Sequence, residues 1–184
     1  MKKKYFTYLI IFSFVSCFNE PNKEVDNVNR KHENKTTNYI KDETKKTNEF
    51  KIENFSGLTP SGESVSLYNL KKKITLIHFW ASWCIPCRHE NSNIVNIHED
   101  YKDKNFSIVS VSLDNDKSEW KRAIRKDNMQ WNNISNLMKW KEPIAELFEV
   151  RSLPTCILLD ENGNIIGKDL RGDELRKKIE QHMP

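Results

Sequence analysis

The apolar residues of the second half of the chain follow two spacings, one typical of strands and one typical of helices. Near-continuous apolar runs at 74–80 and 106–113 indicate strands that are covered on both faces. Between them, apolar residues recur at helical spacing and predict a helix over about 84–101. We therefore expect a βαβ unit with parallel strands and a right-handed crossover.

Further elements are predicted on both sides of this unit. Alternation at Val65 and Leu67, after a turn signal at 59–62, predicts an N-terminal β-hairpin. Residues 129–140 show no clear pattern. The remaining segments predict a helix capped by Asp116 or Ser118, a short helix at 143–148, a hairpin turning at 160–163 and a last helix at 173–182. The order favours an α/β fold with a mixed central sheet and helices on both faces.

The first 49 residues have a different character. Three lysines and an apolar run at 5–15 precede Ser16-Cys17, as in a cleaved secretion signal, and eleven residues are too few to span a bilayer. Residues 18–49 are rich in Asn, Lys, Glu, Asp and Thr and predict a disordered tether, because they cannot bury enough apolar surface. We expect a signal at 1–17, a tether at 18–49 and a folded domain at 50–184.

The end of the signal, residues 14–17, resembles that of bacterial lipoproteins, in which the cysteine is lipidated and becomes the new N-terminus. This resemblance implies a lipid anchor on Cys17, although Phe14 stands where the pattern usually has leucine. An ordinary cleaved signal with an incidental cysteine is the alternative. Both place the mature protein outside the cytoplasm, where disulfides persist.

The charge of the chain gives no reason to expect a nucleic-acid partner. Its 30 basic and 26 acidic residues give a net charge of +4, but Lys2, Lys3 and Lys4 lie in the predicted signal. The remainder carries 27 basic and 26 acidic side chains, which is close to balance.

Cys84 and Cys87 stand three positions apart at the predicted strand–helix junction. A helix beginning at Cys84 would place its sulfur over free backbone N–H groups at the positive end of the helix dipole, which stabilises a thiolate. Outside the signal the chain has one further cysteine, Cys156, so the count suits one redox pair and a single thiol. A structural zinc site would need a second ligand pair, which the sequence lacks. We expect thiol–disulfide exchange without metal or cofactor.

Three stretches together resemble the membrane-tethered TlpA/ResA-type thiol–disulfide oxidoreductases of the thioredoxin fold. They are residues 79–90 (FWASWCIPCRHE), 109–114 (VSVSLD, with Trp120 following) and 150–163 (VRSLPTCILLDENG). The resemblance covers about residues 50–184. It implies a thioredoxin fold, and the proline between the cysteines favours a reducing protein.

The resemblance also implies roles for site residues. Cys84 would be the nucleophile and Cys87 the resolving thiol. Glu90 would lie close to the pair with a raised pKa and exchange a proton with Cys87, or else be a solvated helix acid. Pro154 would be a cis-proline facing the pair, in a loop whose backbone pairs with extended substrates. Ser92 departs from the proline common in relatives.

For two other residues near the pair, His78 and Cys156, the sequence leaves two interpretations open. His78 occupies the strand position where cytoplasmic thioredoxins have a buried aspartate, so it either carries a proton or is simply hydrogen-bonded in place. Cys156 is expected to be a buried strand residue, with a redox role as the alternative. We expect Trp80 in the core and Trp83 beside the exposed sulfur.

The sequence thus predicts a monomeric, extracytoplasmic oxidoreductase that reduces protein disulfides and is recharged by a membrane thiol reductase. Family analogy makes apocytochrome c thiols one conceivable client. A thiol peroxidase of the AhpC/TSA type is one alternative, but Ile77 and Ala81 stand where its pattern has proline and threonine or serine. A non-catalytic metal carrier is the other, although copper carriers of this fold have three residues between their cysteines rather than two.

Overall fold

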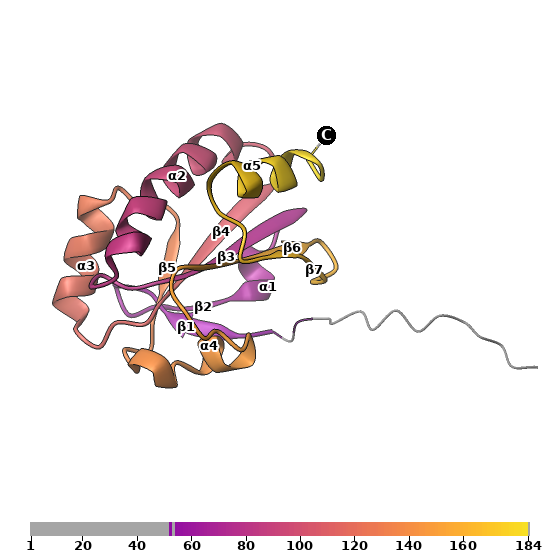
Figure 1. Cartoon of the computed structure of the whole chain (residues 1–184). Helices are drawn as coiled ribbons and strands as arrows, with labels where there is room; N and C mark the ends of the chain where they lie inside the picture. The colour runs from indigo at the N-terminus through magenta and orange to yellow at the C-terminus, as the bar shows by residue number, and fades with distance from the viewer. Residues whose placement is uncertain (1–51, 53, 184) are drawn as a thin grey trace, which may run out of the picture. The chain divides into compact units, whose positions relative to one another are not determined.

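The computed structural model describes residue 52 and residues 54–183, and the structural statements that follow concern these residues. They form a five-stranded mixed sheet in the order β5-β4-β3-β6-β7 (Figure 1). Strands β3, β4 and β5 are parallel, and β6 and β7 run antiparallel to their neighbours. Their bounds are Ile74–Trp80 (β3), Phe106–Ser112 (β4), Asn132–Ile134 (β5), Thr155–Asp160 (β6) and Ile165–Lys168 (β7).

The two central strands confirm the prediction from the apolar runs. All seven residues of β3 are buried, and β3 pairs with β4 over its whole length, from Ile74↔Phe106 to Trp80↔Ser112. A strand covered on both faces is mostly apolar, which explains why the sequence of β3, in which only Thr75 and His78 are polar, does not alternate.

Helices cover both faces of the sheet, as predicted. On one face α2 (Ile85–Tyr101) and α5 (Gly172–Glu180) lie beside each other and bury Ile94, Ile97 and Leu175 (Figure 1). The core of the other face is closed by α1 (Leu67–Leu70), α3 (Lys117–Lys126) and α4 (Pro143–Leu147).

The N-terminal hairpin is present as a separate two-stranded sheet, β1 (Ser56–Leu58) with β2 (Ser64–Ser66). It ends one residue earlier than predicted, because Leu67 begins α1 instead of continuing the strand. The carboxamide oxygen of Asn54 accepts from the Ser66 hydroxyl (2.9 Å) and the Tyr68 N–H (3.2 Å), which fixes this turn.

Most other boundaries agree with the sequence to within a few residues. Asp116 is the residue that caps α3, accepting backbone N–H groups of Ser118 and Glu119. The stretch without a clear pattern contains β5 and a 3-10 helix, η1 (Lys139–Lys141). Leu137 and Lys139 there have positive φ angles, a backbone state that side-chain periodicity does not signal.

The predicted signal (1–17) and tether (18–49) lie outside the described residues. Within residues 54–183, no helix has the length and apolar character needed to cross a membrane.

Candidate active site

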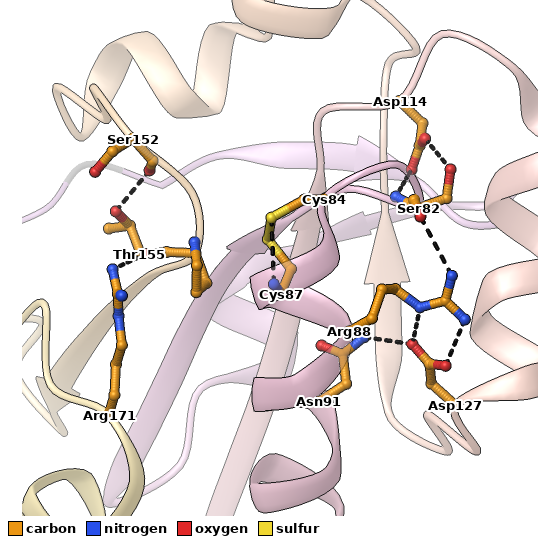
Figure 2. The surroundings of a disulfide bond; sticks show 11 residues. Ser82, Cys84, Cys87, Arg88, Asn91, Asp114, Asp127, Ser152, Thr155 and Arg171 are labelled. Atoms are coloured by element: carbon orange, nitrogen blue, oxygen red, sulfur yellow. Dashed lines mark hydrogen bonds and ion pairs between the residues drawn. A yellow bond between two sulfur atoms is a disulfide. The ribbon is translucent and has the colours of Figure 1, made fainter.

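Cys84 and Cys87 form a disulfide between the end of β3 and the start of α2, with their Cα atoms 5.2 Å apart (Figure 2). Cys84 is the N-cap of α2, and its Sγ accepts the Cys87 backbone N–H at 3.2 Å. Pro86 occupies the first turn, where a backbone N–H has no helical partner to lose. The pair therefore sits where the sequence predicts it, at a helix N-terminus.

The two sulfurs differ in accessibility. Cys84 is 6% exposed, whereas Cys87 is fully enclosed on the inner side of the first turn. An incoming disulfide therefore reaches Cys84, and Cys87 can act only from within.

Asp114 fastens the loop before Cys84 to the end of β4. Its buried carboxylate accepts the Ser82 N–H (3.0 Å), the Ser82 hydroxyl (2.6 Å) and the Ser112 hydroxyl (2.6 Å). Three donors on one carboxylate leave the loop little freedom, so the first cysteine is held in place before any client arrives.

Arg88 follows the pair directly but is committed elsewhere. Its guanidinium donates two hydrogen bonds to Asp127 and one to the Ser82 carbonyl at 3.2 Å (Figure 2). The Asp127 carboxylate raises the pKa of Arg88 and also accepts the Asn91 amide at 2.7 Å. The Asp127 carboxylate therefore neutralises the positive charge of Arg88, the cationic residue nearest in sequence to the cysteines.

The peptide bond before Pro154 is cis, as the family resemblance implied. Thr155, the first residue of β6, pairs with Phe79 near the end of β3. Pro154 therefore lies at the same end of the sheet as the loop that carries Cys84. The Pro154 carbonyl accepts from Arg171 at 2.5 Å, and the Thr155 hydroxyl donates to the Ser152 carbonyl at 2.9 Å. Arg171 escaped sequence analysis, since nothing local marks it.

Glu90 is buried on α2, which contradicts the alternative of a solvated helix acid. One carboxylate oxygen accepts the Gly172 backbone N–H at 3.1 Å, and the other accepts the Asn93 amide at 3.1 Å. Gly172 is the first residue of α5, where free N–H groups and the helix dipole favour a negative charge. Glu90 therefore links the helix of the cysteines to the helix that follows Arg171.

His78 is buried in β3 within a short hydrogen-bond chain. The Trp131 indole N–H can only donate, and it donates to the Ser110 hydroxyl at 2.7 Å. Ser110 Oγ in turn lies within hydrogen-bond distance of His78 Nδ1, at 3.1 Å. Burial lowers the pKa of His78 to about 3. The interpretation as a proton carrier near neutral pH is therefore wrong, and His78 is hydrogen-bonded in place.

Cys156 is a buried residue of β6, as expected, and its thiol is free. Burial raises the pKa of this thiol strongly, and the nearby Glu90 raises it further. The redox alternative for Cys156 has no support, because a thiol that stays protonated is a poor nucleophile. Across the described residues, no three His, Cys, Asp or Glu side chains gather as a metal site would require.

The two tryptophans near the pair are buried and exposed as the sequence predicts. Trp80 is enclosed in the core, whereas Trp83, next to Cys84, is half exposed. Ile77 and Ala81, at the positions that distinguish a peroxidase, are buried apolar residues. The site thus has one accessible sulfur and one enclosed sulfur. Neither Ile77 nor Ala81 carries a hydroxyl group.

Comparison with known proteins shows to which family this arrangement belongs. Residues 72–165 match a family described as thioredoxin-like. The chain belongs to the thioredoxin-like family. It is 34% identical over 131 residues to a thioredoxin-like protein, YneN, of Bacillus subtilis, covering 70% of this chain and 74% of the relative. It is 25% identical over 130 residues to the thiol-disulfide oxidoreductase ResA of Bacillus thuringiensis, covering 71% and 73% of the two chains.

Solved structures of this family agree with the sequence relatives. A thiol-disulfide oxidoreductase from Bacteroides fragilis superposes with a TM-score of 0.67 and 31% identity, covering 71% of this chain and 98% of that one. The thioredoxin domain of such an enzyme from Bacteroides vulgatus gives 0.68 and 33%, covering 73% and 96%. With its Cys84–Cys87 pair, this chain is a thiol–disulfide oxidoreductase of the thioredoxin fold.

Proposed function

We propose that this oxidoreductase reduces disulfide bonds in protein clients outside the cytoplasm. The observation that carries the proposal is the position of Cys84, whose sulfur caps α2, accepts the Cys87 N–H and is the less buried of the pair. A helix N-terminus favours the thiolate, which is the attacking species.

The reaction consists of two exchanges. The Cys84 thiolate attacks one client sulfur, forming a Cys84–client mixed disulfide and releasing the second client sulfur as a thiolate. The Cys87 thiolate then attacks Cys84 Sγ, forming the Cys84–Cys87 bond and releasing the first client sulfur. Two electrons pass to the client, and the client thiolates take up two protons.

We infer the direction from the few groups that contact Cys84 Sγ, which add only modestly to the effect of the helix N-terminus on its thiolate. A pair becomes strongly oxidising when its reduced form is stabilised. In the described residues a single N–H donates to Cys84 Sγ, and Arg88, the neighbouring cation, is held by Asp127. Modest stabilisation keeps electrons available for clients, in agreement with Pro86 between the cysteines.

Glu90 and Pro154 complete the proposed site. Glu90 is buried on the same helix as Cys87 and would exchange the proton that Cys87 gains and loses. The cis-Pro154 loop lies at the same end of the sheet and would pair its backbone with an extended client segment.

The location and electron supply rest on the first 49 residues. The basic and apolar pattern ending at Cys17 supports export and lipid attachment, and the polar stretch 18–49 supports a tether. If this stretch is a flexible tether, its roughly 32 residues would reach about 30 Å, enough to hold the domain near a membrane. The oxidised pair would then be recharged by a membrane thiol reductase.

Trapping the mixed disulfide tests the roles of the two cysteines. The reduced Cys87→Ser protein should accumulate a covalent adduct with an oxidised protein such as insulin, seen by non-reducing electrophoresis and mass spectrometry. The Cys84→Ser protein should form none, because Cys87 is enclosed. Cys156→Ser is the matched control and should reduce insulin like the unchanged chain. Adducts on Cys87 instead of Cys84 would reverse the assignment.

A further inference from the structure

An open groove lies directly beside the redox pair. It has a volume of about 480 Å³ and is lined by Trp83, Asn115, Lys139 and Trp140. Trp83 precedes the nucleophile Cys84, and Asn115 follows Asp114, the residue that fastens the redox loop. The groove is therefore lined by the residue next to the nucleophile and by the residue next to the one that fastens its loop.

The far wall of the groove is a segment held in shape at an energetic cost. Leu137 and Lys139 have φ angles of 60° and 54°, which are unfavourable for side chains other than glycine. The fully buried carboxylate of Glu142 accepts the Asn136 N–H at 2.9 Å and the Asn136 amide at 2.7 Å. A strained turn fastened by a buried acid is an ordered wall rather than a loose loop.

This wall presents large apolar side chains to solvent beside the charged Lys139. Trp140 and Met138 are each 47% exposed, and Trp83 across the groove is 50% exposed. Large apolar side chains held in water by a costly turn indicate a binding surface. The chemistry of the pair says what covers it, because a client bonded to Cys84 through a disulfide must lie against the neighbouring Trp83.

On the basis of the proposed function, we propose that Trp83 and Trp140 form a clamp for a large apolar side chain next to the client's reacting cysteine. The client is an extended or unfolded protein segment, since folded proteins bury such side chains. Lys139 in the groove favours an acidic residue in that segment over a basic one. The clamp supplies affinity and adds no chemical step.

Peptide disulfides with matched sequences test this clamp with the full, reduced chain. The peptides carry Phe or Ala beside the cystine, and the Phe peptide is made with a neighbouring Glu or Lys. We expect kcat/KM to be on the order of tenfold higher for Phe than for Ala, and higher with Glu than with Lys.

Trp140→Ala should remove the preference for Phe, whereas Trp140→Phe should keep most of it. Tyr68→Ala is the matched control, because Tyr68 is 56% exposed but does not line the groove. Tyr68→Ala should keep the preference for Phe at the level of the unchanged chain. An unchanged preference in Trp140→Ala would overturn the clamp while leaving the proposed function intact. Failure of the unchanged chain to reduce any disulfide would instead overturn the proposed function.

Discussion

The three thiols of the folded domain differ in reactivity because their surroundings differ. Cys84 caps a helix and receives an N–H, Cys87 is enclosed beneath it, and Cys156 is buried in the sheet near the charge of Glu90. Only the first combines access with thiolate stabilisation. In the proposed reaction, Cys84 therefore starts the exchange, Cys87 completes it and Cys156 takes no part.

His78 makes a prediction at the same scale, about acid stability. Its pKa is about 3 in the folded state and near 6.5 when the chain unfolds. Between these values the unfolded state binds more protons, so the free energy of unfolding falls as the pH falls. Burying His78 should therefore cost about 2 kcal/mol of stability between pH 7 and pH 5. Urea unfolding at several pH values measures this loss.

His78→Asn provides the comparison, because Asn does not titrate. The variant starts from a different stability, but the part of the pH dependence that belongs to His78 should be absent. Carboxylates with lowered pKa values, such as Asp116 and Asp160, act equally in both proteins. Parallel pH curves for the two proteins would show that His78 is protonated in the folded state.

At the scale of elements, the site is assembled by contacts between segments that are far apart in the sequence. The Glu90 carboxylate joins α2 to the start of α5, and Arg171, just before α5, holds the Pro154 carbonyl at 2.5 Å. The helix of the cysteines and the cis-proline loop thus share one support, the Arg171–Gly172 corner. In the proposed function, Arg171 would act on clients through Pro154 and would be a positioning residue.

Arg171→Met tests this support and should loosen the loop that pairs with clients. We expect kcat/KM for insulin to fall about tenfold, mainly through a higher KM, since a hydrogen bond from a charged group is lost. The rate with a small aromatic disulfide should not change. Arg176→Met is the matched control, because Arg176 lies within α5 and pairs with the exposed Asp100. Equal losses in both variants, or a loss with the small disulfide, would contradict a positioning role.

The sequence predicted those elements whose pattern is local. The near-continuous apolar run of β3, the helix spacing of α2 and the Asp116 cap each depend on neighbours within a few residues. The Glu90–Gly172 contact spans 82 positions and the Ser82–Asp114 contact spans 32, so no local pattern reports them. Trp140 lies in a turn shaped by positive φ angles, and its place beside Trp83 appears only in the folded chain.

At the scale of the whole molecule, the domain gathers its reactive parts at one end of the sheet. The redox loop leaves the end of β3, the cis-Pro154 loop enters β6 at the same level, and the groove of Trp83 and Trp140 opens beside them. A client can therefore meet the nucleophile, a backbone edge and an apolar clamp together.

The central claim is that the pair donates electrons to clients, and the reduction potential of Cys84–Cys87 tests it most directly. The full chain is equilibrated with defined ratios of reduced and oxidised glutathione or dithiothreitol, and the oxidised fraction is read by thiol alkylation. With one N–H donor on Cys84 and its neighbouring cation Arg88 held by Asp127, we predict a potential near that of thioredoxin, about −270 mV. A value near that of the oxidant DsbA, about −120 mV, would contradict the account and reverse the direction of electron flow.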